Sequence, residues 1–461
     1  MKLPEPALYF DVTDVVEYAM VNSTMTGIQR AALRILESVV RQNAGRHVYG
    51  LVKHPLTDTY KMANLEFMRD SYCLRDFAGR FELPTGKALW IARKLRKYRN
   101  APVKRFFRRC MLHIKWATSS RLRAQVAAFS LETRSSCLMD LELLPGSAIV
   151  NLGAGWGTDY HGLEKLARSH GCRVAAVIYD IVAITAPQYT GLSKEKSLRF
   201  RKWLDYISQN YDILICGSSF TKEEVEEYLA PKRGVADIKV VHLAHEFKAP
   251  AENPQSEIRK SIIDLAGGKY ILCVGTIEIR KNILELLHAW GEFRESRGGN
   301  TPNLVLAGSR GWKVENVYDL LRRTANVGGT VKIVDKPTDV ELEFLYRNCE
   351  FTVFPSLFEG WGLPIGESLW FGKPVICADN ASMPEVGGRF ATYFSHDKPG
   401  SLLAALERMI DKPASLPKDI RSYLTTWDGT ANSICSAIEA RSSACGPQML
   451  RKKALPGKPC A

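Results

Sequence analysis

The sequence predicts an α/β protein of two domains, each built on a largely parallel sheet with helices on both faces. Strand-like apolar runs alternate with helical patterns through both halves of the chain, and this alternation is typical of parallel sheets. A polar, proline-containing segment at 248–268 separates the two series. With 461 residues and 46% hydrophobic content, the chain is long enough for two cores of ordinary domain size.

The N-terminal half, expected to form a domain over 1–247, opens with a strand, a loop and a helix. LYFDVTDVV (8–16) reads as the first buried strand and its exit, and AALRILESVV (31–40) reads as the helix. Further strand-like runs follow at 147–153, 172–181, 211–219 and 238–244. One helical pattern between them is TKEEVEEYLA (221–230), where Thr221 is expected to cap the first turn.

After the expected linker at 248–268, a second series of strands and helices forms a domain over 269–441. YILCVGTIEIRKNILELLHAW (270–290) reads as a buried strand, a glycine turn and a helix, and 331–356 reads as strand, loop, helix and strand. The final segment, 442–461, has little periodicity and is rich in Gly, Pro and Lys, so we expect a disordered tail.

The segment FPSLFEGWGLPIGESLWFGKPVICAD (354–379) carries Glu359 and Glu367 on either side of a seven-residue loop rich in Gly and Pro. Small residues let the backbone approach a ligand, and Pro364 suits the first turn of a helix. Amides at a helix start bind phosphate, and carboxylates accept hydrogen bonds from sugar hydroxyls. Such a pair of glutamates also occurs as surface charge or capping, but the strands before and after it favour a nucleotide-binding site.

These residues resemble the E-x7-E signature of family 4 glycosyltransferases, which are retaining, metal-independent enzymes of the GT-B fold that use nucleotide-sugar donors. The resemblance implies two Rossmann-like domains that face a central cleft in which the donor lies. It further implies that Glu367 contacts the ribose, and that Glu359 and the amides of 360–363 hold the sugar. The helical segment from about 415 onward would cross back to the first domain.

Donor binding and catalysis are assigned on the same resemblance. The donor-binding residues would be Gly275, Thr276, Val334, Gly360, Trp361, Gly362, Leu363 and Glu367, with Val334 near the base. Glu359, Lys281 and Arg280 would be catalytic, with the two cations at a helix start neutralising the diphosphate as the sugar bond breaks. Thr276 stands where many relatives have an arginine, so Arg280 is expected to supply that charge. An exposed basic pair with a structural role is the alternative.

The acceptor side of the cleft is placed in the first domain. Thr26 and Gly27 resemble the small-residue loop that relatives hold beside the acceptor and the donor phosphates, although an ordinary helix cap explains them equally well. VIYDIVAITAPQY (177–189) resembles a stretch in which His-Asp follows a strand; here Tyr179 replaces the histidine and Asp180 is retained. A turn at the end of the strand is the alternative role for Asp180.

The positive charge of the chain is concentrated between Leu83 and Leu131, where 13 Lys or Arg residues stand with no Asp or Glu. Runs such as KALWIARKLRKYR (87–99) place apolar residues at helical spacing, so we expect a basic helical insertion in the first domain. Basic amphipathic helices bind anionic membrane surfaces, which is the interpretation we favour. A solvated insertion is the alternative, and a nucleic-acid patch is disfavoured because no recognition module accompanies the charge.

The sequence predicts a cytoplasmic protein without a metal or a cofactor. No apolar run is long enough to span a bilayer, and the N-terminus lacks a signal-peptide pattern. Eleven cysteines without a C-x-x-C pair suit a reducing compartment and give no zinc-site spacing. We expect the protein to be peripheral on the inner face of the cytoplasmic membrane.

The expected reaction is transfer of a hexose from a nucleotide sugar, with mannose from GDP-mannose as the favoured donor, to a lipid-linked or polysaccharide acceptor in surface polysaccharide or lipopolysaccharide synthesis. The resemblance requires no separate general base, because the leaving phosphate assists deprotonation of the acceptor. Two alternatives stay open. One is a soluble transferase that acts on a small sugar or sugar phosphate, and the other is a noncatalytic membrane scaffold with a nucleotide-sugar fold.

Overall fold

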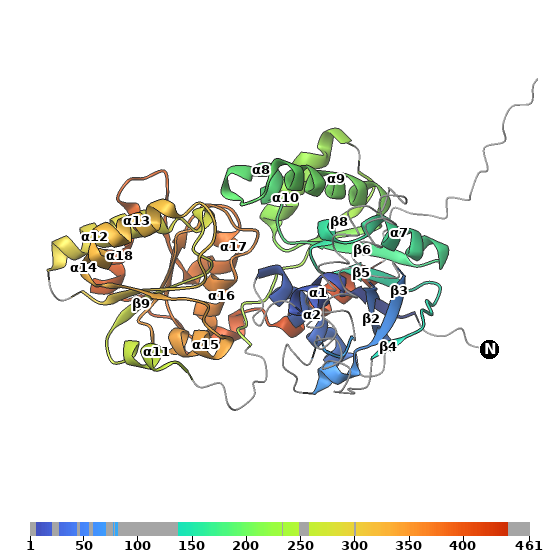
Figure 1. The fold of residues 1–461 in the computed structure, drawn as a ribbon, viewed down its shortest axis with the longest axis horizontal. Coiled ribbons are helices and arrows are strands. Elements are labelled where there is room, and N and C mark those ends of the chain that lie inside the picture. Colours follow the sequence, from blue (N-terminus) through green and yellow to red (C-terminus); the bar gives the residue numbers. More distant parts are fainter. Residues whose placement is uncertain are drawn as a thin grey trace, which may run out of the picture.

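The computed structural model describes residues 6–20, 27–43, 47–54, 59–70, 77, 79–81, 137–232, 234–248, 258–298 and 301–440. As the sequence predicts, they form two α/β domains, which lie side by side (Figure 1). The predicted basic insertion at 83–131 and the predicted tail at 442–461 lie outside the described residues.

The first domain is built on an eight-stranded sheet in the order β4-β3-β2-β1-β5-β6-β7-β8. Its strands are β1 (Leu8–Asp11), β2 (Val48–Lys53), β3 (Tyr60–Asn64), β4 (Leu138–Met139), β5 (Ala148–Asn151), β6 (Arg173–Ile178), β7 (Ile213–Cys216) and β8 (Asp237–Val240). In this spatial order, the neighbouring strands β2-β1-β5-β6-β7-β8 are all parallel to one another. Strands β3 and β4 extend the sheet beyond β2, and each pairs antiparallel with its neighbour. The direction of strand addition reverses at β1, so a crevice is expected between the ends of β1 and β5.

The second domain has a six-stranded, fully parallel sheet in the order β11-β10-β9-β12-β13-β14. Its strands are β9 (Tyr270–Val274), β10 (Asn303–Ala307), β11 (Val331–Val334), β12 (Thr352–Phe354), β13 (Val375–Ala378) and β14 (Thr392–Phe394). The order reverses between β9 and β12. In open α/β sheets ligands bind beyond the carboxyl ends of the strands at this point. The loop that carries Glu359 follows β12 and therefore lies there.

Helices connect the strands of both domains. The first domain contains α1 (Thr13–Ala19), α2 (Gly27–Gln42), α7 (Tyr160–Ser169), α8 (Val182–Thr185), α9 (Lys194–Asn210) and α10 (Ser219–Leu229). The second half of the chain contains α11 (Lys260–Leu265), α12 (Ile283–Arg297), α13 (Glu315–Arg323), α14 (Ala325–Gly328), α15 (Asp339–Asn348), α16 (Leu363–Trp370), α17 (Met383–Gly387), α18 (Ser401–Asp411) and α19 (Trp427–Glu439). Helices α16 and α17 lie on the side of the second domain that faces the first (Figure 1).

Two details differ from the sequence prediction. Helix α10 begins before Thr221, because Ser218 is its N-cap and accepts a hydrogen bond from the Thr221 amide. Part of the predicted linker is helix α11, whose Ile262 is buried in the core of the second domain beside Tyr270. That segment has the apolar spacing of a short helix, which its polar and proline-rich neighbours obscured.

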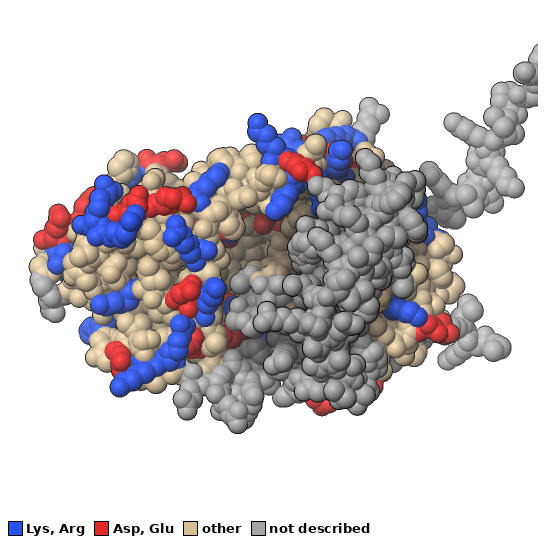
Figure 2. Space-filling view, in the orientation of Figure 1, with Lys and Arg blue, Asp and Glu red and all other residues tan. Residues whose placement is uncertain are grey.

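The last described helix returns to the first domain. Helix α19 packs against α2, and its first residue, Trp427, is buried. The indole Nε1 of Trp427 donates a hydrogen bond to the Glu246 carbonyl at 2.9 Å, and the Trp427 amide donates to the Glu246 carboxylate at 2.9 Å. The two domains are thus joined by a second passage of the chain. The face drawn in Figure 2 is hollowed between them, and positive and negative side chains are interspersed over the second domain.

Candidate active site

The sequence-predicted donor residues of the second domain meet where its sheet order reverses. Glu359 lies in the loop between β12 and α16, and Glu367 lies on α16. Arg280 and Lys281 lie in the turn between β9 and α12. Two adjacent strands therefore deliver the carboxylates and the cations to the same edge of the sheet.

Glu359 is held between both cations. Its two carboxylate oxygens lie 2.6 Å from Arg280 Nη1 and 2.7 Å from Lys281 Nζ. Burial of the carboxylate opposes ionisation, but the charges of Arg280 and Lys281 outweigh it and lower the pKa of Glu359 to about 2. Glu359 is therefore ionised at neutral pH, with its charge balanced inside its own domain.

Sequence reasoning missed a second carboxylate in this cluster. Glu278, only 2% exposed, lies 2.6 Å from Arg280 Nη2, and Arg280 Nη1 also donates to the Phe358 carbonyl at 3.0 Å. The charge alternation in Glu278-Ile279-Arg280-Lys281 was the available signal. Arg280 thus ties the turn after β9 to the loop after β12. Diphosphate binding by Arg280 stays a prediction.

Lys281 makes one ion pair, to Glu359, and its side chain is only 11% exposed. Besides Glu359 it contacts the face of Phe354, with Nζ 4.4 Å from the ring centroid. Gly275 makes this position possible, because a Cβ there would lie 3.2 Å from Lys281 Cε and the backbone has φ +141°. Thr276, the next residue, is half-buried.

The loop between the two glutamates lies against the first domain. A Cβ on Gly360 would lie 1.9 Å from the Tyr179 carbonyl oxygen, so only glycine fits this contact. The Thr221 hydroxyl lies 3.3 Å from the Gly360 carbonyl oxygen, also across the boundary. Gly362 adopts φ +105° as the N-cap of α16, and Leu363 begins that helix. The loop is therefore shaped jointly by both domains.

Trp361 is the buried aromatic residue of this loop. Its ring stacks on His242 of the first domain, with centroids 5.2 Å apart. Its indole Nε1 is buried and has no hydrogen-bond partner among the described residues. A buried donor without a partner is uncommon, which makes this N–H a candidate contact for a ligand oxygen.

Glu367 is surrounded differently. Arg30 of α2 places Nη1 3.0 Å from Glu367 Oε1, and the Tyr346 hydroxyl donates to Oε2 at 2.8 Å. Burial raises the pKa of Glu367, and the opposing effects of Arg30 and Tyr346 do not cancel it. Arg30 is a second residue that sequence reasoning missed. It is 337 positions away from Glu367, and nothing local marks the contact.

The residues predicted for the acceptor side occupy separate positions in the first domain. Tyr179 directs its hydroxyl to the Leu152 carbonyl at 2.8 Å, so its side chain lies in the core while its backbone meets Gly360. Asp180 is half-buried and accepts a hydrogen bond from the Val182 amide; burial raises its pKa, and the charge of Arg280 opposes that shift. Gly27, at φ +52°, begins α2, whereas Thr26 lies outside the described residues.

Val334, predicted to lie near the base, ends β11 with its side chain in the core of the second domain. Its carbonyl accepts the Gly308 amide at 3.0 Å. A base contact through the backbone of this region stays a prediction.

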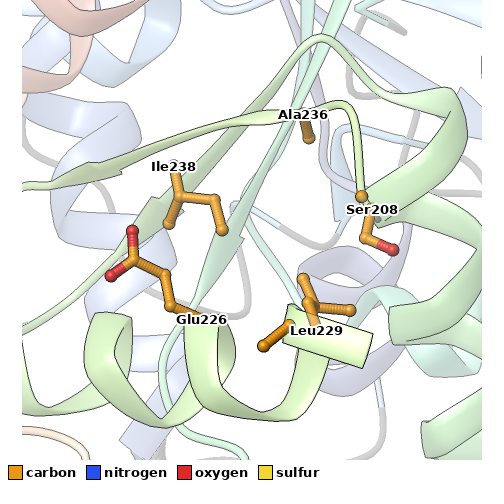
Figure 3. Close-up of a pocket in the computed structure, with 7 residues that line it drawn as sticks. Ser208, Glu226, Leu229, Ala236 and Ile238 are labelled. Atoms are coloured by element: carbon orange, nitrogen blue, oxygen red, sulfur yellow. The ribbon is translucent and has the colours of Figure 1, made fainter. Parts of the chain in front are cut away.

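A hollow of about 220 Å³ lies elsewhere in the first domain (Figure 3). It is lined by Ser208 of α9, Glu226 and Leu229 of α10, and Ile238 of β8. The opposite end of α10 faces the second domain, where the Ser219 and Phe220 amides each donate to the Glu385 carboxylate at 2.7 Å. The hollow shares no residue with the predicted donor or acceptor sites.

Two further features are absent from the described residues. They contain no group of three or more His, Cys, Asp or Glu side chains arranged to hold a metal ion. Across the same part of the chain, no helix combines the length and the apolar character needed to cross a membrane.

Comparison with known proteins defines the class of the fold. Sucrose-phosphate synthase from Thermosynechococcus elongatus superposes with a TM-score of 0.56 at 16% identity, covering 94% of this chain and 98% of that one. The lipopolysaccharide outer core galactosyltransferase WaaB superposes with a TM-score of 0.50 at 12% identity, covering 94% and 99%. The protein therefore has the two-domain GT-B architecture, and the fold class predicted from the sequence is confirmed.

The particular domain is identified by sequence. Residues 254–427 match the family described as "Glycosyl transferases group 1". The chain is 26% identical over 253 residues to the serotype-specific mannosyltransferase WbdA of Escherichia coli, and 29% identical over 231 residues to the O-antigen chain mannosyltransferase B of Escherichia coli. These matches span 53% and 50% of this chain, but only 30% and 59% of the respective relatives. Most of the second domain thus matches a glycosyltransferase group 1 domain, and these findings support a glycosyltransferase enzyme.

Proposed function

We propose that the protein is a retaining glycosyltransferase of family 4 that transfers a hexose from a nucleotide sugar to a lipid-linked or polysaccharide acceptor. Mannose from GDP-mannose is the proposed donor, because the two Escherichia coli relatives are named as mannosyltransferases. Surface polysaccharide synthesis is the proposed setting, because one of them is named for the O-antigen chain.

One observation carries the proposal: Glu359 is ion-paired to both Arg280 and Lys281 at the point where the second sheet reverses its strand order. A buried carboxylate accepts hydrogen bonds from sugar hydroxyls, and adjacent cations stabilise negative charge. A nucleotide sugar presents both groups, a hydroxyl-rich ring joined to a diphosphate.

In the proposed reaction the bond between the sugar carbon and the diphosphate breaks, and negative charge grows on the leaving oxygen. Lys281 reaches this oxygen by moving from Glu359, while Arg280 stays anchored by Glu278 and keeps the loop in place. The acceptor hydroxyl approaches the same face of the sugar, its oxygen forms the new bond to the sugar carbon, and its proton passes to the leaving phosphate. The Trp361 indole N–H and the start of α16 are proposed further contacts to donor oxygens.

A lipid-linked acceptor and a place on the inner face of the cytoplasmic membrane are proposed from the basic segment at 83–131 alone. Electrostatic attraction to anionic lipids would bring the cleft close to such an acceptor. Charge reversal across Arg93 to Arg99 should then release the protein from anionic vesicles without changing its affinity for the donor. Persistent vesicle binding by that variant would contradict the membrane role.

The test is a donor screen on purified protein in the presence of a metal chelator. Binding and slow hydrolysis of GDP-mannose, UDP-glucose, UDP-galactose and dTDP-rhamnose are followed. One preferred donor is expected, with GDP-mannose first. Binding of none of them by the wild type would refute the donor site and favour the noncatalytic scaffold, whereas transfer to a free sugar phosphate would favour the soluble alternative.

A further inference from the structure

Arg30 connects the two domains at the carboxylate that is proposed to bind ribose. It lies in the first turns of α2, in the first domain, yet its guanidinium is embedded among residues of the second. Nη1 bonds to Glu367 at 3.0 Å and Nη2 bonds to Asp339 at 2.5 Å. The guanidinium carbon also lies 5.6 Å from the centroid of the Phe247 ring. One cation of the first domain therefore balances two carboxylates of the second.

This arrangement leaves hydrogen-bonding capacity directed at the donor site. Each oxygen of a carboxylate can accept two hydrogen bonds. Glu367 Oε1 accepts one from Arg30 and Oε2 accepts one from Tyr346, so each oxygen retains one free position for a ribose hydroxyl. Arg30 Nε is buried and has no hydrogen-bond partner among the described residues, so its N–H is available to a ligand oxygen. The hydrogen bonds from Arg30 and Tyr346 therefore leave acceptor positions of Glu367 unused.

We propose that Arg30 is a positioning residue of the donor site, contributed by the acceptor-side domain, which orients Glu367 for the two ribose hydroxyls only when the domains are closed. The inference rests on the proposed nucleotide-sugar function. It differs from it in assigning part of donor recognition to the first domain.

The charges of the site explain why the second domain alone would be incomplete. Without Arg30, the buried Glu367 and the half-buried Asp339 would stand as two carboxylates that disfavour each other's ionisation. A protonated Glu367 has lost acceptor capacity and would hold ribose hydroxyls less well. Domain closure brings the guanidinium that opposes the rise in the pKa of Glu367 and fixes the carboxylate in orientation.

The experiment compares two probes that differ only in the ribose hydroxyls. Dissociation constants of GDP and of 2′,3′-dideoxy-GDP are measured by calorimetry for the wild type, Arg30→Gln, and the matched control Arg41→Gln. Arg41 lies on the same helix and pairs with the exposed Asp428, away from the donor site. If the donor screen selects a uridine donor, UDP and 2′,3′-dideoxy-UDP replace the guanine pair.

We expect Arg30→Gln to weaken GDP binding about tenfold or more, and to change binding of the dideoxy probe by less than about twofold, because the lost bonds act through the ribose hydroxyls. Arg41→Gln should bind both probes like the wild type. Arg30→Lys keeps the charge but not the planar fork, so an intermediate loss confined to GDP is expected, and this variant decides the question if Arg30→Gln does not fold.

An equal loss for both probes would overturn the proposal and leave Arg30 as a contact that only closes the domains. Unchanged GDP binding by Arg30→Gln would overturn it as well, as would a wild type that does not distinguish the two probes. A wild type that binds neither probe while binding another nucleotide sugar would refute guanine as the base. One that binds no nucleotide at all would refute the donor site itself.

Discussion

The two glutamates of the donor segment lie eight positions apart but differ in how their charge is balanced. Glu359 pairs with Arg280 and Lys281, both from its own domain, and its pKa is lowered to about 2. Glu367 pairs with Arg30 of the other domain, and burial raises its pKa. The charge of Glu359 is thus balanced within its own domain, whereas the charge balance of Glu367 depends on domain closure.

This difference indicates a division of labour within one short segment. The region around Glu359 holds the groups expected to act on the sugar and the diphosphate, and the two cations that pair with Glu359 both come from the second domain. The region around Glu367 includes a side chain from the first domain, so its arrangement depends on contact between the two domains. Variants that separate these two roles are the most direct way to examine the comparison.

The largest effect is expected from Lys281→Ala. Loss of the cation that neutralises the leaving phosphate should lower kcat by about 100-fold or more, since removal of one preorganised charge-stabilising group commonly costs this much. Thermal unfolding should change little, because Arg280 still pairs with Glu359. Lys412→Ala, at an exposed position of the same domain, serves as the control. A turnover within about threefold of the wild type would contradict the role of Lys281.

The next effect tests the contact between the domains. In Gly360→Ala the new methyl group would meet the Tyr179 carbonyl, so the loop after β12 or the first domain must move. Displacements of about 1 Å at a reacting centre can cost up to 100-fold, and we expect kcat to fall about tenfold or more. Gly268→Ala is the control, because a Cβ there meets nothing within 4 Å. Equal activity of both variants would show that this close approach is not needed for turnover.

Much of the Glu359 region could be predicted from the sequence because its chemistry is local. Glu359, Glu367 and their glycines occupy one segment, and Arg280 and Lys281 are adjacent, so a short pattern indicates most of the site. Glu278 was missed although it stands two residues before Arg280, because burial of a carboxylate cannot be recognised from its charge alone.

The Glu367 region could not be predicted in the same way. Arg30 reaches Glu367 only because α2 of one domain is placed against α15 and α16 of the other, and no periodicity encodes that placement. Tyr179 shows the reverse case. It stands where relatives have a functional histidine, but its side chain turns into the core and only its backbone lies at the boundary.

The two carboxylates should also differ in the pH dependence of stability. Since the pKa of Glu359 is lower in the folded than in the unfolded state, its contribution is complete above about pH 4.5 and is lost as the pH falls toward 2. That shift corresponds to a contribution on the order of 3 kcal/mol at neutral pH. For Glu367, whose pKa is raised in the folded state, the pH dependence of stability is reversed. Its contribution is present at low pH and is lost as the pH rises through the folded-state pKa.

At pH 7, Glu359→Gln should therefore lower the urea midpoint, while Glu367→Gln should leave it unchanged or raise it. Urea unfolding of both variants and the wild type, from about pH 2 to pH 7, measures the two slopes. If the urea midpoint fell by a similar amount in both variants, the distinction between the two glutamates would be wrong.

The smallest effect is expected from Glu385→Gln, which weakens a domain contact remote from the ribose. Glu385 accepts hydrogen bonds from the Ser219 and Phe220 amides at the start of α10, and these bonds together with His242 outweigh burial and lower its pKa to about 2. A neutral amide at this position loses the charge in these bonds, which is worth about 1 kcal/mol. The donor KM should rise a few-fold, and binding of GDP should weaken more than binding of its dideoxy analogue, because weaker closure holds Arg30 less firmly against Glu367. Glu350→Gln, exposed in the same domain, is the control. Equal weakening of both probes would show that closure does not act through Glu367, and would contradict the dependence of that carboxylate on the first domain.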